Sequence, residues 1–335
     1  EDPRPGGEDP HAGGEDPQPG EKKPRSGGKD PRAGGKASRP GEGDDAAPGR
    51  APGNEGRPGG EATHGPDLEE EERAQAEERT SIGAHIVHEA IRREGEEELM
   101  RPPAALAFSG LAGGLSMGFS LVAEGLLRSH LPDTNWRPLV ARAGYSLGFL
   151  IVILGRQQLF TENTLTAVLP LLARRDRRTL IAMLRLWGIV LATNLLGALA
   201  MSWVLHSTGV FEAPVKAEFL ALGREAMGHD FPTTVLRGVF AGWLIALIVW
   251  LTPAAKENKI WVILILTYIV GLAGLAHIIA GAVEVFYAAW AGAHGWGQVL
   301  GSFLTPTLIG NIIGGGMLVA ALNYAQVTAG QESSE

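Results

Sequence analysis

Long apolar segments fill the chain from residue 101 to residue 327, and charged residues are rare within them. A helix needs about 20 largely apolar residues to cross the hydrocarbon core of a membrane. Helices that span directly are therefore predicted near residues 104–126, 180–205, 234–253, 260–283 and 300–325. The pattern is typical of an all-α membrane protein, with a membrane domain at 101–327 and a short C-terminal tail at 328–335.

Residues 138–173 are also apolar, but they do not form one continuous span. The apolar runs 143–155 and 163–173 are each too short to cross, and the polar sequence RQQLFTEN lies between them at 156–163. Irregular backbone at membrane depth persists only where protein or water satisfies it. Broken helices often direct backbone groups toward a permeating solute. We therefore expect a broken second helix, which brings the number of transmembrane crossings to six.

Basic residues in the loops predict how the chain is oriented. Positive residues concentrate on the cytoplasmic side of membrane proteins. Three arginines in the first loop weigh the other way: Arg128, Arg137 and Arg142. A larger set follows the second and fourth crossings: Arg174, Arg175, Arg177, Arg178, Lys256 and Lys259. The larger set predicts a multi-pass protein of the plasma (inner) membrane with both termini in the cytoplasm.

The first hundred residues have a different composition from the rest. Residues 1–66 contain 17 Gly and 12 Pro, which predicts a disordered low-complexity tail that cannot bury a core. Residues 67–100 are rich in helix-forming residues, and we expect an amphipathic cytoplasmic helix there, starting at Leu68. Its apolar stripe would consist of Ile82, Ile86 and either Ala90 or Ile91.

Charge and composition exclude several classes of function. Residues 1–100 carry 14 Lys+Arg and 25 Asp+Glu, a net charge of −11, which argues against nucleic-acid binding. The chain has no cysteine, so thiol chemistry and Cys-ligated metals are excluded. We find no nucleophile motif, metal-ligand cluster or phosphate loop. The sequence predicts neither an enzyme nor a bound cofactor or metal.

Two polar residues stand inside apolar helices. His277 lies among Gly271, Gly274 and Gly281, and polar residues at membrane depth tend to be functional. Equally, its imidazole could donate to a neighbouring carbonyl. Asn311 precedes three successive glycines, and it could hydrogen-bond a permeant or tie a helix kink. Both alternatives remain open for each residue.

Four motifs give the membrane domain a family resemblance. The run Gly310-Asn311-Ile312-Ile313-Gly314-Gly315 resembles the closing signature of the formate/nitrite transporter family. Three further matches stand in the family's order: Leu159-Phe160-Thr161 following Ser146-Leu147-Gly148, then Asn194 to Ala198, then Gly274 with His277. The resemblance covers roughly residues 100–326 and indicates a divergent inner-membrane branch.

The resemblance implies a homopentamer in the lipid membrane, with one aquaporin-like pore in each protomer. Family members pass small monovalent anions such as formate, nitrite or hydrosulfide, often coupled to protons. By this resemblance the pore would be lined at its centre by His277, Thr161 and Asn311. Leu159 and Phe160 would form one apolar constriction, and the other would consist of Tyr145, Phe149 and Val270.

The sequence departs from the family pattern near the pore. Ala276 and Gly281 occupy positions where members usually have Glu and Asn, and Gly242 replaces a further Asn. Three charged residues lie near the break and in the fifth helix: Arg156, Glu162 and Glu284. We expect Arg156 and Glu162 to form a mutual salt bridge that holds the loop, or all three to modify permeant selection.

A bare anion loses much hydration free energy at an apolar constriction, whereas a protonated weak acid does not. The leading hypothesis is therefore a channel or transporter for small weak-acid anions, linked to pH or protons through His277. The alternatives are a channel for a neutral or cationic solute, and a non-conducting membrane scaffold or sensor.

Overall fold

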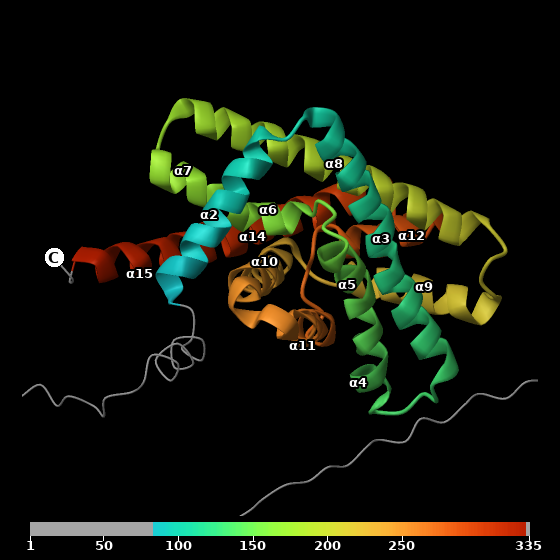
Figure 1. Cartoon of the computed structure of the whole chain (residues 1–335). Helices are drawn as coiled ribbons and strands as arrows, with labels where there is room; N and C mark the ends of the chain where they lie inside the picture. The colour runs from blue at the N-terminus through green and yellow to red at the C-terminus, as the bar shows by residue number, and fades with distance from the viewer. Residues whose placement is uncertain (1–82, 333–335) are drawn as a thin grey trace, which may run out of the picture. The chain divides into compact units, whose positions relative to one another are not determined.

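The structure, a computed structural model, describes residues 83–332. The chain divides into two units, Glu1–Pro66 and Asp67–Glu335, and the described residues all belong to the second. Every regular element among them is helical, in agreement with the predicted all-α class (Figure 1). The expected tail at 1–66 and the expected helix start at Leu68 lie outside the described residues.

The elements follow one another along the chain with short connections. They are α2 (Ala84–Met100), α3 (Pro103–His130), α4 (Arg137–Ala141), η1 (Arg142–Tyr145), α5 (Ser146–Leu154), α6 (Phe160–Thr166), α7 (Val168–Arg174), α8 (Arg177–Ser207), α9 (Ala213–Ala226), α10 (Phe231–Ala255), η2 (Lys256–Asn258), α11 (Lys259–Leu272), α12 (Ala280–Trp290), α13 (Trp296–Gln298), η3 (Val299–Leu304), α14 (Thr305–Ile312), η4 (Ile313–Ala320) and α15 (Ala321–Glu332).

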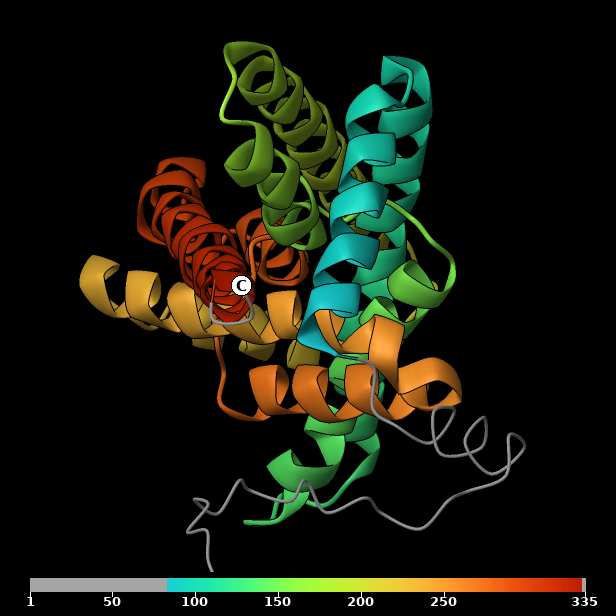
Figure 2. The ribbon, with the colours of Figure 1, turned by 60° about the vertical axis from the view of Figure 1, so that its left-hand side comes forward.

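Five of the described segments are long and apolar enough to cross a membrane: Pro103–His130, Arg137–Leu154, Arg177–Ser207, Phe231–Leu272 and Trp296–Val327. This number is one fewer than the six crossings expected from the sequence. The fourth segment contains two helices, because η2 folds α11 back against α10 (Figure 2). The 11-residue α12 is too short to be counted by itself.

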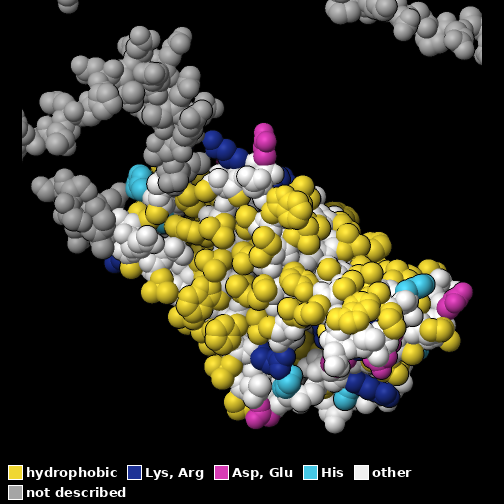
Figure 3. Space-filling model, turned by 90° about the horizontal axis from the view of Figure 1, so that it is seen from below, with side chains coloured by type: hydrophobic (Ala, Val, Ile, Leu, Met, Phe, Trp, Pro, Cys, Tyr) yellow, Lys and Arg dark blue, Asp and Glu magenta, His cyan; other side chains and the backbone are white. Residues whose placement is uncertain are grey.

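The surface between the polar ends is apolar. Figure 3 shows hydrophobic side chains across most of one face, with the charged side chains gathered toward its ends. Large residues such as Phe240, Trp261 and Ile265 are more than half exposed on the helices. An apolar surface of this extent fits contact with lipid or with neighbouring subunits rather than with water.

Two helices are interrupted. α5 ends at Leu154 and α6 begins at Phe160, within the polar sequence expected to break the second helix. The second interruption lies between α11, which ends at Leu272, and α12, which begins at Ala280. The prediction of one continuous helix over 260–283 is therefore wrong. Gly274 has a φ of +58°, a left-handed conformation that glycine adopts without strain and that ends the helix there.

Helices without a break pack closely beside each interruption. α8 lies against α3, and α14 lies against α10. Gly114 on α3 contacts the backbone of Asn194, and Gly242 on α10 contacts the backbone of Asn311; a Cβ at either glycine would overlap that backbone. Small residues at such positions let helices approach in a membrane. They bring an asparagine side chain to each interruption.

The first described helix, α2, packs against α6, α7, α8, α10 and α15. Its buried side chains repeat every fourth residue at Val87, Ile91, Gly95 and Leu99, which is one face of a helix. The expected stripe is wrong at Ile86, which is 60% exposed. Ile91, one of the two alternatives for the third position, is buried as expected, and Ile82 lies outside the described residues. Val87 takes the place of Ile86 because this face of α2 packs against the core residues Leu165 and Leu169.

Candidate functional site

The two interruptions meet at a hydrogen bond between Thr161 and His277. Thr161 lies in the first turn of α6, and His277 lies just before α12. The Thr161 Oγ1 and His277 Nε2 atoms are 2.8 Å apart, and both side chains are buried. The structure therefore brings together two residues that are 116 positions apart in the chain and that the sequence predicts at the centre of a pore.

Hydrogen bonds fix the protonation of the imidazole. The backbone N–H groups of Ile279 and Ala280 donate to His277 Nδ1 at 3.3 and 3.1 Å. Nδ1 is thus an acceptor, and the single hydrogen of a neutral imidazole lies on Nε2. Nε2 then donates to Thr161 Oγ1. A second proton on Nδ1 would face two N–H donors, so the surroundings favour the neutral ring.

Asn194 holds the first interruption. From α8, its side-chain Nδ2 donates to the carbonyls of Gly110 and Gln158 at 2.6 and 2.9 Å. Its Oδ1 accepts the N–H of Phe160 at 2.9 Å. The amide therefore replaces helix hydrogen bonds that the interruption removes, which matters because unpaired backbone groups are costly when buried.

Asn311 has the same arrangement at the second interruption. From α14, Nδ2 donates to the carbonyls of Gly238 and Ala276, both at 2.9 Å, and Oδ1 accepts the N–H of Ile278 at 2.9 Å. Both amide hydrogens are therefore used by backbone carbonyls. Asn311 thus ties the break between α11 and α12, and its role toward a permeant stays a prediction.

Aromatic and aliphatic side chains lie around the Thr161–His277 pair. The Phe149 ring is 4.9 Å from the His277 ring and 5.4 Å from the Tyr145 ring, in centroid distances. Leu159 and Phe160, which directly precede Thr161 in the chain, are also buried, and Phe160 packs on Trp187. Apolar groups thus lie next to both members of the central hydrogen bond.

Beyond Tyr145 and Val270 lies a cavity of about 330 Å³ on the side of α9. Its charged and titratable lining residues are Arg142, Tyr145, Glu225, His229, Arg237 and Glu284. Burial, aided by the nearby positive charge of Arg237, lowers the pKa of His229 below its usual value. The cavity therefore combines groups of both charge signs at the entrance to the aromatic residues.

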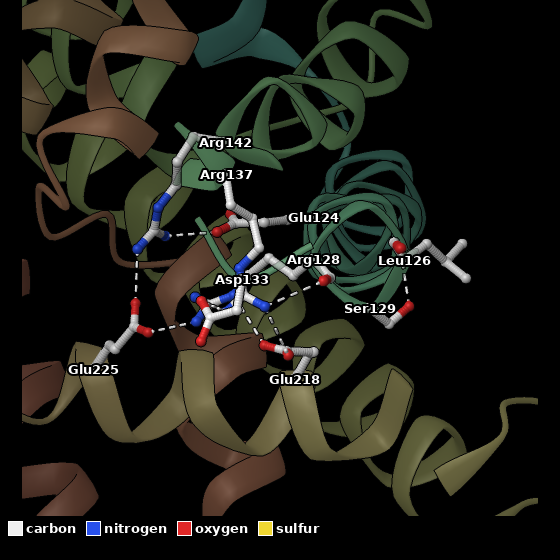
Figure 4. A network of polar contacts seen from close by, with 9 residues as sticks. All are labelled: Glu124, Leu126, Arg128, Ser129, Asp133, Arg137, Arg142, Glu218 and Glu225. Atoms are coloured by element: carbon white, nitrogen blue, oxygen red, sulfur yellow. Dashed lines mark hydrogen bonds and ion pairs between the residues drawn. The ribbon is translucent and has the colours of Figure 1, made fainter. Parts of the chain in front are cut away.

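A chain of ion pairs, shown in Figure 4, includes two of the residues that line this cavity, Arg142 and Glu225. The guanidinium of Arg142 lies 2.7 Å from the buried Glu124 carboxylate and 2.7 Å from that of Glu225. The guanidinium of Arg128 lies 2.8 Å from Glu225 and 3.0 Å from Glu218. Burial opposes the ionisation of Glu225, but the hydrogen bonds and charges of Arg128 and Arg142 outweigh it and hold its pKa below the usual value. The network fixes α9 against α3 and η1.

Comparison with known proteins identifies the family. The family model described as formate/nitrite transporter matches residues 85–325. The chain belongs to the formate/nitrite transporter family. It is 39% identical over 251 residues to the inner membrane protein YfdC of Escherichia coli K12, covering 75% of this chain and 81% of YfdC.

Two solved structures share the fold of this formate/nitrite transporter family member. A structure described as an FNT family ion channel matches with a TM-score of 0.61 at 17% identity, covering 72% of this chain and 98% of the other. A pentameric formate channel with formate bound matches with a TM-score of 0.56 at 20% identity, covering 70% and 98%. The chain is a multi-pass membrane protein of a transport family, as the sequence predicted, and not an enzyme.

The charged residues near the first interruption are arranged differently from the expectation. Arg156 does not pair with Glu162; it lies 3.7 Å from Glu94 on α2, and its side chain is largely exposed. The irregular backbone between the two residues directs their side chains apart. Arg156 has a φ of +51° at the start of the break, and Glu162 lies six residues later, in the first turn of α6. The predicted salt bridge is wrong.

Sequence patterns alone do not reveal several residues of the site. They mark Asn194 only as part of a motif, and Glu124 only as the end of a charge-free interval. Arg237 donates to the carbonyls of Gly274 and Ala273 at 2.8 and 2.9 Å, so it caps the end of α11. No periodicity in the sequence indicates that pairing. Across residues 83–332 no group of three His, Asp or Glu side chains could hold a metal ion.

Proposed function

We propose that this family member forms a transmembrane pathway for small monovalent weak-acid anions such as formate. The pathway runs from the α9-side cavity past Tyr145, Phe149 and Val270, through the Thr161–His277 pair, and past Leu159 and Phe160. The observation that carries the proposal is the buried Thr161–His277 hydrogen bond, set between two broken helices and flanked by apolar side chains.

The chemistry of the pair supports passage as the neutral acid. A carboxylate stripped of water between Phe149 and Phe160 would lose most of its hydration free energy, whereas a protonated acid loses far less. His277 Nε2–H can donate to the permeant, and the Thr161 hydroxyl can donate or accept in turn. The permeant thus carries its proton past His277 as a neutral acid, and the imidazole itself stays neutral.

We further propose six crossings within the inner membrane and both termini in the cytoplasm. α10 is long enough to cross alone, and α11 and α12 together make one crossing, as α4 to α7 do. The basic turn at Arg174–Arg178 then lies on the cytoplasmic side with α2, and α9 lies outside. The first-loop arginines that weighed against this orientation are neutralised by Glu124, Glu218 and Glu225.

A homopentamer with an aquaporin-like protomer is the assembly we propose. The solved formate channel of the same fold is pentameric, and the exposed apolar residues of α8, α10 and α11 offer surface for neighbouring subunits. Glu284 beside the pathway favours a second candidate, a pathway for neutral or cationic solutes, because an ionised carboxylate repels anions.

Flux measurements with purified protein in liposomes test the proposal. We expect uptake of formate, nitrite or hydrosulfide above that of empty liposomes, and no comparable uptake of ammonium or glycerol. His277→Ala removes the central donor, and uptake should fall by at least about tenfold. Flux of ammonium or glycerol alone supports the second candidate. Flux of no solute contradicts transport and supports a scaffold, and unchanged uptake in the variant excludes the role of His277.

A further inference from the structure

Two oppositely charged residues of the α9-side cavity differ from their neighbours in having no counter-charge. Glu225 and Arg142, which also line it, are paired with each other and with further partners. Glu284 has neither a hydrogen bond nor an ion pair within residues 83–332, although its side chain is only 9% exposed. Arg237 bonds two carbonyls and the imidazole of His229, but it has no carboxylate partner in the described part of the chain.

The position of Glu284 places it on the pathway. It stands on α12, seven residues after His277, and it lines the cavity together with Tyr145 and Val270 at its inner end. Gly281, one turn earlier on the same helix, also lines the cavity, and a Cβ at this position would overlap the ring of Phe303. A permeant drawn into the cavity by the positive charge of Arg237 therefore reaches the Glu284 carboxyl before it passes Phe149, which does not line the cavity and lies between Tyr145 and His277.

We infer that Glu284 is the proton-exchange group of the pathway: in the α9-side cavity its carboxyl group donates a proton to the incoming weak-acid anion. This inference rests on the proposed function and deepens it. Glu284 lies outside the central Thr161–His277 pair, and the proton transfer takes place in the cavity rather than at the imidazole.

The step balances in atoms and charge. The O–H bond of the Glu284 carboxylic acid breaks, an O–H bond forms on the permeant anion, and Glu284 is left as a carboxylate. The neutral acid then passes Phe149 and the Thr161–His277 pair. Water in the open cavity reprotonates Glu284, so each turnover moves one anion and one proton and no net charge. On the other side of the membrane the acid releases its proton to water.

His277 is poorly placed for the same step. Its Nδ1 accepts two backbone N–H bonds, and its Nε2–H is directed at Thr161, so neither nitrogen is both basic and open to the cavity. Between His277 and the cavity stand Phe149 and Tyr145. A proton given to the anion at His277 would come after the anion had crossed those rings unprotonated, at the greatest cost in hydration.

The other charges around Glu284 come from every element near it and set its response to pH. A carboxyl group that is removed from water, with other carboxylates nearby, keeps its proton more readily than an exposed one, and nearby cations oppose this. The titratable and charged groups are Glu124 and Arg128 on α3, Arg142 and Tyr145 on η1, Glu225 on α9, His229 after α9, Arg237 on α10, and His206 on α8, which packs on Tyr287.

The test uses formate uptake into proteoliposomes over external pH values from about 5 to about 8, a range that covers the shifts buried carboxyls show. Glu284→Gln keeps the shape of the side chain but cannot exchange a proton. We expect its initial uptake to fall by at least about tenfold relative to wild type, and its pH profile to follow the concentration of neutral formic acid in water, because no group in the cavity then supplies the proton. Glu284→Asp keeps a carboxyl group and should retain a clear part of the wild-type rate and pH profile.

Controls separate proton exchange at Glu284 from a failure of the proposed function and from other roles of the same side chain. Glu212→Gln, an exposed glutamate at the start of α9, should leave uptake unchanged. If wild-type protein gives no uptake above empty liposomes, the proposed function itself fails. If wild type transports and Glu284→Gln keeps its rate and pH profile, only this inference is overturned. Faster uptake in Glu284→Gln shows a repelling charge instead, and equal losses in the Gln and Asp variants show a requirement for packing; either result overturns it.

Discussion

The two helix interruptions are built alike and used differently. At each, the side-chain amide of an asparagine on a neighbouring helix donates to one carbonyl of the helix packed against it and to one carbonyl of the break. The amide oxygen accepts one backbone N–H of the break. The two sets of partners are Gly110, Gln158 and Phe160 for Asn194, and Gly238, Ala276 and Ile278 for Asn311. Each break leaves buried backbone groups without helix partners, and in both cases an asparagine side chain supplies the missing hydrogen bonds.

What surrounds the two interruptions differs. The first faces α2, where Gln158 donates to Glu98 at 2.8 Å and Arg156 lies near Glu94. The second faces the α9-side cavity, where Arg237 caps the end of α11 and Glu284 has no ion pair within the described residues. The backbone scaffold is thus common to both halves, and the distinct chemistry is supplied by a few side chains placed around it.

Removing either asparagine should have the largest effect on stability. Asn194→Ala and Asn311→Ala each leave three buried backbone groups unpaired, and each unpaired group costs about 1–3 kcal/mol. We expect a loss of at least about 3 kcal/mol for both variants, measured as lowered thermal unfolding temperatures in detergent. Asn323→Ala is the matched control, because Asn323 donates only to Val319 at the α15 end of the chain. A large loss at one asparagine and none at the other would break the equivalence of the two interruptions.

The charged residues around the second interruption predict an effect of intermediate size on transport. Arg237→Gln removes a cation from the cavity and weakens the cap on the carbonyls of Ala273 and Gly274 at the end of α11. Because cavity charge steers anions, we expect formate uptake to fall severalfold, mainly through weaker capture at low ionic strength. The measurement is initial uptake against formate concentration at two salt concentrations.

The matched control for this variant lies on the α2 side. Glu98→Gln removes a charge there but keeps an acceptor for the side-chain amide of Gln158. Uptake in Glu98→Gln should change by less than about twofold, because that charge lies away from the cavity in which anions are captured. Equal losses in the Arg237 and Glu98 variants would contradict the assignment of capture to the cavity.

The smallest expected effect concerns the ion-pair network that holds α9. The pKa of Glu225 is held below its usual value in the folded protein. Its contribution to stability is therefore complete above the ordinary glutamate pKa of about 4.3 and is lost as pH falls through the lower folded-state value. Because its side chain is 46% exposed, we expect at most about 1 kcal/mol. Thermal unfolding of Glu225→Gln should thus differ from wild type at neutral pH and converge with it in acid; a difference that grows in acid contradicts this sign.

Part of this arrangement could be predicted from the sequence. The charge-free intervals indicate the helices, because membrane crossing excludes unpaired charge. The polar run at 156–163 indicates the first interruption, and four motifs indicate Thr161 and His277. The second interruption is not predicted, because residues 273–279 are largely apolar and only the left-handed Gly274 marks it.

Other features depend on tertiary contacts that no local pattern shows. The exposed Ile86 and the buried Val87 are both apolar, and only the docking of α2 decides which is covered. Arg156 and Glu162 are close in sequence, yet the backbone turns Arg156 toward α2. The pairing of Arg142 with Glu124 joins residues on different helices and needs the fold of α3 against η1.

The central claim is that a weak-acid anion crosses with its proton as a neutral species. The most direct measurement is formate uptake into proteoliposomes at a series of imposed membrane potentials, with a trapped pH indicator to record proton entry. We expect an uptake rate that does not depend on potential, accompanied by one proton for each formate. Uptake that follows the membrane potential without proton entry would contradict it.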